Sequence, residues 1–518
     1  MEQITMDLLL SLLSWQSITA TAVVYCLTLA FYRLYLHPLA KFPGPKLAAV
    51  TRYYEAYYDV VKHGQYTFRV AEMHKQYGPI VRISPYELHI NDPAYFEKLY
   101  RHEGRWNKYG WAVDAQNALG AIIFTPDHHQ HKARRAPLNA YFSKARVVRH
   151  QDMIVRKLEK LCARITESAE SAKVIDLGAA ISAFQRDVST EYVLGKDYSS
   201  LDQPDFSVGM TRIMHGGGRM WHLTKHIRWY GPAMLFIPKD FLIKHADPDT
   251  ANFMQYAKDS EEDTARLLKA AASYSPDDDT PRTIVHEIYD SNLPPEDKTV
   301  ERVFSDVVSV TGAGFETTAS LLRLVIYHVF SHPEILTRLR AELVEAATRS
   351  SSSPDGSIPL QTLEQLPYLT AALMEGMRLS PAIASRSQRI APDRDLIYDK
   401  YRIPAGTPVG MTVLLMHTDE RLYPDPHRFD PERWVDPEAR KRSEKTYAPF
   451  SRGTRICIGM HLAWAEMYLL MAALVQRFDF DFDGGLTSKD HFKVMSDQFI
   501  ISTRGKAVLE TRVSLCRR

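Results

Sequence analysis

The sequence predicts a mainly helical protein with small β-sheets, preceded by one apolar segment long enough to cross a membrane. Three observations indicate this fold class. Apolar stretches with helical spacing run over residues 300–330 and 460–478, whereas alternating patterns predict only short strands within residues 77–85 and 87–90. Residues 8–32 contain no charge, and this run exceeds the roughly 20 residues that span a bilayer. No linker-like composition divides the rest, so one large domain is expected.

The N-terminal apolar segment is expected to be an uncleaved membrane anchor. Acidic Glu2 and Asp7 precede it, whereas Arg33, Lys41 and Lys46 follow it. This asymmetry places the following part of the chain in the cytosol by the positive-inside rule. A cleaved signal peptide is the alternative, but the acidic start and the lack of a small-x-small site disfavour it.

A proline-rich stretch follows the anchor. Three prolines between residues 38 and 45 predict a stiff, non-helical connector that orients the main body against the membrane. We therefore divide the chain into an anchor at residues 1–36, a hinge at residues 37–50 and a main domain at residues 51–518.

Composition excludes several classes of function. Of the 518 residues, 45% are hydrophobic and 24% charged, which permits a large core and argues against disorder. The net charge is +2, and no stretch combines dense Lys and Arg with stacking aromatics, so no nucleic-acid partner is expected. The four cysteines lack C-x-x-C spacing, which argues against a disulfide framework or a zinc site and favours a reducing compartment.

Cys457 is the strongest candidate for chemistry. It directly precedes the apolar helix predicted over residues 460–478, where free N–H groups and the helix dipole favour a thiolate. Gly453 and Gly459 flank it where a loop needs a tight turn or a close approach to a flat ligand. Arg455 is placed to meet an anionic group on that ligand. Taken alone, Cys457 is better explained as a buried structural cysteine, which is what most free cysteines are.

The whole spacing favours the ligand-binding interpretation. Phe-x-x-Gly-x-Arg-x-Cys-x-Gly, from Phe450 to Gly459, resembles the haem-binding loop of the cytochrome P450 family. Serine stands at position 451, where the family usually has glycine. The resemblance implies that Cys457 is the thiolate ligand of a haem b iron, and that Phe450, Gly453 and Arg455 help to bind the haem.

Three further segments carry the resemblance in the order that the family has them. His131 and Arg135, one helical turn apart, resemble the pair that holds a haem propionate, although the neighbouring histidines 128 and 129 leave a metal site as the alternative. Arg389 is expected at the other propionate. Residues 312–318 resemble the oxygen-side helix segment, in which Glu316 and Thr317 manage protons beside a widened turn. Close packing of the glycines against another helix is the structural alternative.

The last segment is a predicted structural lock. Glu375 and Arg378 lie three apart on an apolar helix, so the pair is expected to be buried and to need a third partner. Arg433, in the segment 429–434, supplies that partner by resemblance to the lock behind the family's haem loop. We expect Glu375, Arg378 and Arg433 to serve folding and haem retention rather than chemistry.

The resemblance implies a cytochrome P450 fold behind one transmembrane helix, most like the fungal secondary-metabolism branch with trichodiene-oxygenase-like enzymes. The implied activity is an O2- and NADPH-dependent oxidation, such as hydroxylation, of a lipophilic small molecule, a terpenoid or other secondary metabolite. The substrate is expected against residues 106–124, 210–236, Val308, Ala313, Ile383 and Phe499.

No flavin or nicotinamide segment follows the main domain in this sequence, so the expected partner is NADPH–cytochrome P450 reductase, with cytochrome b5 as an optional second donor. Arg134, Lys144, Lys445 and Arg452 are its expected basic docking face. The expected location is the endoplasmic reticulum membrane, single-pass, with the main domain in the cytosol. A haem-thiolate isomerase or dehydratase, and a non-enzymatic haem-binding protein, are the alternatives.

Overall fold

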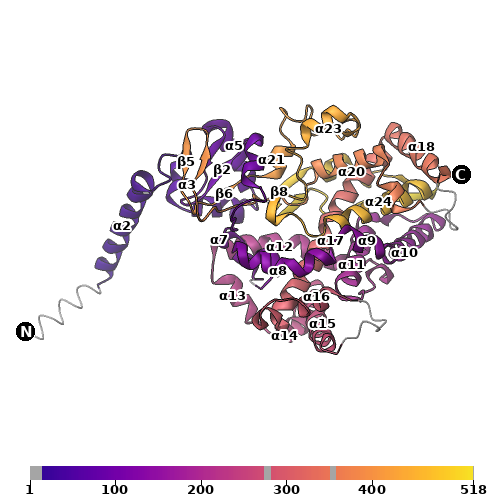
Figure 1. Cartoon of the computed structure of the whole chain (residues 1–518), viewed down its shortest axis with the longest axis horizontal. Helices are drawn as coiled ribbons and strands as arrows, with labels where there is room; N and C mark the ends of the chain where they lie inside the picture. The colour runs from indigo at the N-terminus through magenta and orange to yellow at the C-terminus, as the bar shows by residue number, and fades with distance from the viewer. Residues whose placement is uncertain (1–13, 119, 274–281, 350–357, 517–518) are drawn as a thin grey trace, which may run out of the picture.

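The computed structural model of the chain describes residues 14–118, 120–273, 282–349 and 358–516. Within them the protein is mainly helical and carries four small β-sheets, which confirms the predicted fold class. Figure 1 shows a broad body with one helix, α2, standing away from it at the N-terminal end. The first thirteen residues of the predicted anchor and the last two of the predicted main domain lie outside the described residues.

The apolar N-terminal segment is helical. It consists of α2 (Trp15–Phe31) and the π-helix η1 (Tyr32–Leu36), and the Ser14 side chain caps it by accepting a hydrogen bond from the Ser17 N–H. No residue of α2 is buried, and the helix is long and apolar enough to cross a membrane. A signal sequence meets the same criteria of length and composition, so the anchor stays a prediction.

The predicted hinge is only partly irregular. Residues 37–45 form no helix or strand, and they are tied to the first sheet because the Arg82 N–H donates to the Pro43 oxygen (N···O 2.7 Å). Residues 46–50 form α3 (Lys46–Val50). The domain boundaries themselves stay a prediction.

The sheets are small, with two or three strands each. Strands β1 (Ile80–Arg82) and β2 (Leu88–Ile90) pair antiparallel, and both fall within the predicted strand segments. Strand β2 also pairs in parallel with β6 (Val409–Gly410). The other sheets are β4 (Leu396–Tyr398) with β5 (Tyr401–Ile403), β8 (Val494–Gln498) with β9 (Ile500–Thr503), and the order β3 (Ile175–Asp176), β10 (Glu510–Leu515), β7 (Phe478–Asp481).

The longest helix, α17 (Val300–Ser331), runs through the centre of the body and confirms the helix predicted there. Its start is capped by the Thr299 side chain, which accepts from the Arg302 N–H. It packs against α11 (Leu177–Leu194), α20 (Pro367–Leu379) and α24 (Met460–Arg477), whose buried side chains share one core cluster with its own. Both α11 and α24 are buried over most of their length, and α11 encloses the polar side chains of Gln185, Arg186 and Asp187 as well as apolar ones.

Further helices surround this core (Figure 1). The longer ones are α5 (Tyr66–Tyr77), α8 (His128–Tyr141), α9 (Lys144–Arg149), α10 (Gln151–Glu170), α12 (Val208–His226), α13 (Tyr230–Leu235), α14 (Lys239–His245), α15 (Pro248–Ala271), α16 (Ile284–Tyr289), α18 (Pro333–Arg349) and α23 (Pro437–Ser443). The short ones are α4 (Tyr53–Ala56), α6 (Phe96–Leu99), α7 (Gly110–Val113), α19 (Leu360–Leu363), α21 (Val413–His417) and α22 (Glu432–Val435). Single turns of 3-10 or π-helix are η2 (Tyr57–Val61), η3 (Pro93–Tyr95), η4 (Asp114–Gln116), η5 (Ile122–Phe124), η6 (Ser200–Asp202), η7 (Pro295–Lys298), η8 (Gly453–Arg455) and η9 (Lys489–Phe492).

Candidate active site

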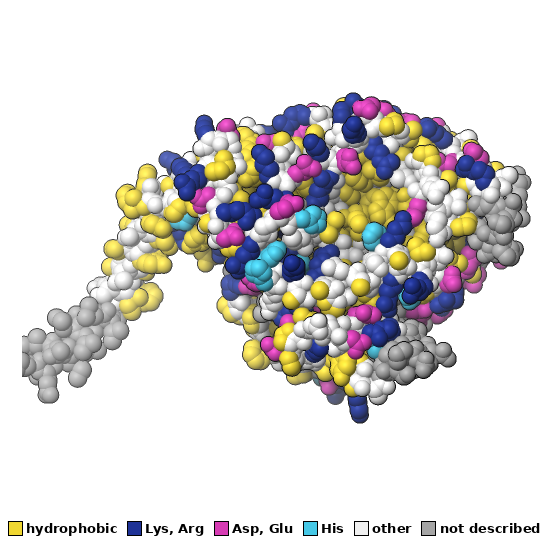
Figure 2. All heavy atoms as spheres, in the orientation of Figure 1, with side chains coloured by type: hydrophobic (Ala, Val, Ile, Leu, Met, Phe, Trp, Pro, Cys, Tyr) yellow, Lys and Arg dark blue, Asp and Glu magenta, His cyan; other side chains and the backbone are white. Residues whose placement is uncertain are grey.

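Cys457 lies in the loop between η8 and the first turn of α24, as the sequence predicts. Its backbone N–H donates to the carbonyl oxygen of Phe450 (N···O 2.9 Å), which closes the loop on itself. The Cys457 side chain is exposed, and it lines a cavity of about 360 Å³ together with Phe450. On the face drawn in Figure 2, hydrophobic side chains line a hollow over α20 and α24.

The helix terminus alone does not make Cys457 a thiolate. Although the Cys457 side chain is exposed to the cavity, the protein around it desolvates the thiol and raises its pKa, and the opposing effects of the Gly459 N–H and the Arg135 charge are smaller. The predicted stabilisation of a thiolate by the helix terminus is therefore outweighed by burial. A coordinated metal ion is the remaining influence that deprotonates a thiol outright.

Two residues of the loop have a left-handed backbone. Gly453 has φ +73°, and a Cβ there would lie 2.6 Å from the carbonyl oxygen of Tyr100, so no side chain fits. Ser451 has φ +60°, at the position where the family usually has glycine. An L-residue in this conformation costs about 1–2 kcal/mol. The loop therefore keeps its path at Ser451 under local strain.

Arg455 is held by main-chain oxygens. Its Nη1 donates to the carbonyl of Thr125 (2.8 Å) and its Nη2 to that of Pro126 (2.9 Å), while Nε is enclosed without a partner. Burial, followed by the nearby charges of Arg389 and Arg135, lowers the pKa of Arg455 to about 9. Such a guanidinium favours an anionic neighbour.

The other predicted cofactor-binding residues line the same cavity as Arg455. His131 and Arg135 both come from α8, and Arg135 Nε donates to Asn139 Oδ1 (2.9 Å). Arg389 is 4% exposed and its guanidinium stacks over the Tyr100 ring at 4.9 Å. Burial, followed by the charges of Arg455 and Lys108, lowers the pKa of His131 to about 2, so this imidazole is neutral at pH 7.

Lys108 belongs to this group and was missed by the sequence interpretation. Its Nζ donates to the carbonyl of Ile123 (2.6 Å), and burial holds its pKa well below the usual range. The sequence offers no signal for it, because a single lysine in a loop matches no motif. Only the folded chain brings it beside Arg455.

We call Lys108, Arg135, Arg389 and Arg455 the cation group. Among the described residues, none of the four forms an ion pair with a carboxylate. Gathered, partly buried cations without carboxylates are unfavourable unless an anion joins them. The residues therefore fit a flat apolar cofactor with acidic side groups and one cysteine ligand. The cavity wall is mostly apolar, and its positive charges lack the negative charges that such acidic groups would supply.

Thr317 lines the cavity from α17, and its Oγ1 donates to the carbonyl of Ala313 (2.8 Å). The helix stays α-helical throughout, so the widened turn implied by the resemblance is not seen here. Gly314 instead permits close packing, since a Cβ there would lie 2.2 Å from Ser189 Oγ on α11. The packing alternative for this glycine is correct.

Glu316 points away from the cavity that Thr317 lines. It is 1% exposed, and its Oε2 meets Arg323 Nη2 (2.9 Å) and His215 Nε2 (3.2 Å), while Oε1 has no partner among the described residues. Burial favours a raised pKa, but Arg323 and His215 outweigh it and lower the pKa of Glu316 to about 2. The structure therefore does not bring Glu316 and Thr317 to one surface.

The predicted lock is present. Glu375 and Arg378 are fully buried and joined by two hydrogen bonds, Nε–Oε2 at 2.8 Å and Nη2–Oε1 at 2.7 Å. Arg433 Nε lies 3.4 Å from Glu375 Oε1, so it contacts the pair as expected. Trp434 Nε1 also donates to Glu375 Oε2 (2.9 Å), a contact that sequence spacing did not indicate. The carboxylate is thus fully partnered.

Most of the expected substrate-contacting segments reach the cavity. Ala313, Ile383 and Phe499 line it, whereas Val308 does not and its neighbours Ser309 and Val310 do. Of residues 210–236, most form α12, from which Trp221 and Lys225 line the cavity. The expected region is therefore mainly a helix, and it places one polar side chain, Lys225, on the cavity wall.

One expected docking residue is misplaced. Arg134 is 8% exposed and its Nη2 lies 2.6 Å from Asp297 Oδ1, so it cannot belong to a basic surface for a partner. It shares α8 with Arg135 but faces η7. The sequence places it one residue from a cavity residue, and helical geometry turns the two apart.

A cysteine before a helix, an apolar cavity and a cation group without carboxylates together define a haem-thiolate protein. A family model of the cytochrome P450 family matches residues 56–506. The chain therefore belongs to the cytochrome P450 family, and it is an oxidoreductase of the monooxygenase class.

Curated relatives cover nearly the full chain. It is 37% identical over 491 residues to the cytochrome P450 monooxygenase MO6277 of Ascocoryne sarcoides (91% of this chain, 93% of the relative). It is 37% identical over 482 residues to the tryptophan 6-hydroxylase fscE of Fusarium equiseti (92% and 92%). It is 36% identical over 509 residues to the cytochrome P450 monooxygenase TRI4 of Fusarium sporotrichioides (96% and 96%).

Proposed function

We propose that this cytochrome P450 holds haem b and oxidises a lipophilic small molecule, a terpenoid or other secondary metabolite of a biosynthetic pathway. The observation that carries the proposal is the meeting of Cys457, the cation group and apolar walls in one cavity. The relatives support it, because they are fungal monooxygenases and hydroxylases. One of these relatives is named a tryptophan 6-hydroxylase, a small-molecule hydroxylase.

The chain's own residues would divide the work of binding. Cys457 would be the thiolate ligand of the iron, and the cation group, with neutral His131, would hold the propionates by charge-assisted hydrogen bonds. Phe450 and Gly453 would shape the loop beneath the ring. The haem iron, when bound, supplies the activation of dioxygen and the transfer of one oxygen atom to the substrate.

Thr317 would handle protons at the cavity wall. Its hydroxyl proton is engaged by Ala313 O (2.8 Å), so its lone pairs remain to accept a hydrogen bond from water or another donor in the cavity. Glu316 lies outside the cavity wall, so a role in proton transfer would require its carboxylate to leave Arg323 and His215.

The proposed partners follow from the chemistry. Electrons would come from NADPH through NADPH–cytochrome P450 reductase, with cytochrome b5 as an optional donor. The chain would be anchored in the endoplasmic reticulum membrane by residues 1–36, joined by the hinge at residues 37–50 to a catalytic domain at residues 51–518 that faces the cytosol. Protease protection of microsomes that carry the full chain tests this orientation: the catalytic domain should be digested without detergent, and protection would contradict it.

The activity is tested with purified protein, the reductase and labelled dioxygen. Pyridine haemochrome analysis should identify haem b, and product formation should require NADPH and carry one labelled oxygen atom. Product formed without NADPH would favour the isomerase or dehydratase alternative instead.

A further inference from the structure

Besides the cation group, the cavity has a second charged region, which we call the Lys225 cluster. It consists of Glu55 on α4, Asp59 on η2, Glu87 between β1 and β2, Lys225 on α12 and Arg386 after α20. All five side chains are buried. Lys225 and Arg386 also line the cavity, so the cluster forms part of its wall.

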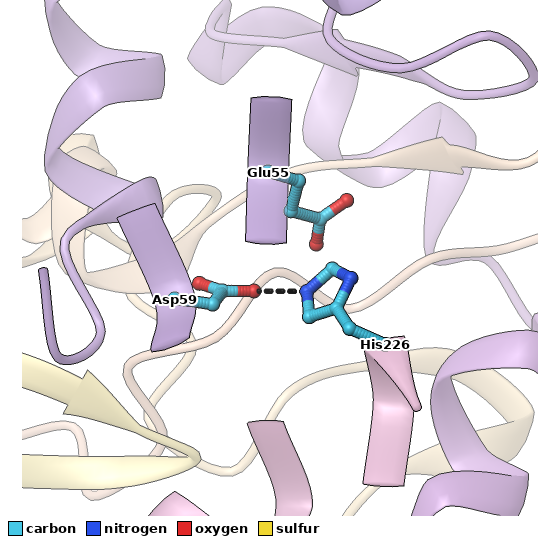
Figure 3. A group of neighbouring side chains, drawn as sticks. All are labelled: Glu55, Asp59 and His226. Atoms are coloured by element: carbon cyan, nitrogen blue, oxygen red, sulfur yellow. Dashed lines mark hydrogen bonds and ion pairs between the residues drawn. The ribbon is translucent and has the colours of Figure 1, made fainter. Parts of the chain in front are cut away.

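The cluster does not require a metal ion. Figure 3 shows the Glu55 and Asp59 carboxylates close to the His226 imidazole, with Asp59 Oδ2 and His226 Nε2 at 3.1 Å, a group that resembles a metal-ligand set. The Lys225 ammonium already binds both carboxylates, Glu55 Oε1 at 3.0 Å and Asp59 Oδ2 more closely still. It also lies 4.5 Å from the centre of the Trp221 ring. The Lys225 ammonium therefore takes the place that a metal ion would have between the two carboxylates.

One nitrogen of the Arg386 guanidinium, Nη1, donates no hydrogen bond among the described residues. Its Nε donates to Glu87 Oε1 (2.6 Å), and its Nη2 to Glu55 Oε1 (2.8 Å) and Glu87 Oε2 (3.1 Å). Nη1 is not completely enclosed by protein atoms, and Arg386 borders the cavity. A guanidinium that is fixed on one side and open on the other is a preorganised donor.

The charge balance of the cluster selects the acceptor. Lys225 and Arg386 are already paired with the three carboxylates Glu55, Asp59 and Glu87, so neither cation lacks a counter-charge. A carboxylate on the substrate would therefore meet no unpaired positive charge in the cluster, whereas an uncharged oxygen needs only a free donor. The carboxylate oxygen Glu55 Oε2 is enclosed, so a substrate ammonium finds no open acceptor there.

We propose that Arg386 is a specificity-determining residue, whose Nη1 donates a hydrogen bond to an uncharged oxygen, a carbonyl or hydroxyl, on the substrate. The remaining carbon skeleton would then lie against Ala313, Ile383 and Phe499. This deepens the proposed function, on which it rests, because it names the substrate class as a lipophilic molecule that already carries one oxygen.

The test is a comparison of three probes with one carbon skeleton: amorphadiene, artemisinic aldehyde and artemisinic acid. Their affinities for the full-chain holoenzyme are measured by calorimetry. The aldehyde should bind about tenfold more tightly than the hydrocarbon and the acid, since one charge-assisted hydrogen bond is gained without added charge. Equal affinities, binding of none of the probes, or preference for the acid would overturn the proposal.

The Arg386→Lys variant sharpens the test, because it keeps the positive charge but removes the guanidinium fork. The preference for the aldehyde should fall below about threefold. Arg349→Lys, at a solvent-exposed position on α18, is the matched control and should leave the preference unchanged. A preference that survives Arg386→Lys would contradict the role of Nη1. If this variant does not fold, the comparison of the three probes on the wild-type protein can still overturn the proposal.

Failure here is distinguishable from failure of the proposed function. Loss of NADPH-dependent oxygen transfer would remove the monooxygenase proposal, whereas calorimetric preference does not depend on turnover. An enzyme that oxidises hydrocarbon and aldehyde with equal binding would retain its proposed activity and lose only the assignment of Arg386.

Discussion

Two buried groups of charges in this protein have opposite designs. In the lock, Glu375 has hydrogen bonds or close contacts with Arg378, Arg433 and Trp434, so every charge finds a partner within the chain. In the cation group, four cations meet main-chain oxygens, a side-chain amide and an aromatic ring, but no carboxylate. The lock is complete without a ligand, and the cation group is not. The difference separates residues that maintain the fold from residues that await an anion.

The largest expected effect comes from breaking the lock. Arg378→Ala should lower the free energy of unfolding by about 3–5 kcal/mol, because it leaves the Glu375 carboxylate buried without its main partner. Urea unfolding followed by far-UV circular dichroism measures it. Arg349→Ala, at an exposed ion pair, should change stability by less than about 0.5 kcal/mol. A similar small effect at Arg378 would show that the lock contributes little.

Removing a cation from the cation group should raise the free energy of unfolding rather than lower it. Lys108→Met removes a buried cation whose pKa is already held well below its usual range, so the haem-free protein should gain about 1 kcal/mol of stability. The same variant should release haem to apomyoglobin about tenfold faster, because one charge-assisted bond is lost. If haem release is unchanged while stability rises, Lys108 does not contact the cofactor.

Acidification should destabilise the haem-free protein through His131. Its pKa of about 2 in the folded protein lies below the 6.5 of an unfolded chain, so below pH 6.5 the unfolded state binds a proton that the folded state does not. Stability should therefore fall as the pH decreases from 6.5 to 5.5, by at most about 1.4 kcal/mol from this residue. His131→Gln should flatten the profile over this range. An identical slope in both proteins would mean that His131 titrates normally when folded.

The smallest effect concerns the loop itself. Ser451→Gly should stabilise the protein by about 1 kcal/mol, because glycine adopts the left-handed backbone at this position without steric cost. The same change at Ser309, inside α17, should destabilise by about 0.5–1 kcal/mol. Thermal unfolding of both variants checks the pair, and a destabilised Ser451→Gly would argue that its hydroxyl has a role.

Local motifs made much of the site predictable. The cysteine loop, the His131–Arg135 turn and the Glu375–Arg378 pair each depend on residues within a few positions, where helix and turn geometry fix the neighbours. The central helix and the small strands follow from periodicity for the same reason.

What the sequence did not indicate depends on contacts between distant segments. Lys108 reaches Arg455 only in the fold, Trp434 completes the lock from another helix, and Glu316 turns toward His215 because α12 crosses α17 there. The burial of Arg134 against Asp297 is of the same kind. Spacing along one element cannot show which face meets which partner.

The most direct test of the central claim is the carbon monoxide difference spectrum of the reduced protein, recorded for wild type and Cys457→Ala. Thiolate ligation by Cys457 predicts a strongly red-shifted Soret band in wild type that is absent from the variant. A histidine-type band in wild type, or a red-shifted band that persists in Cys457→Ala, would contradict the assignment of Cys457 as the haem ligand.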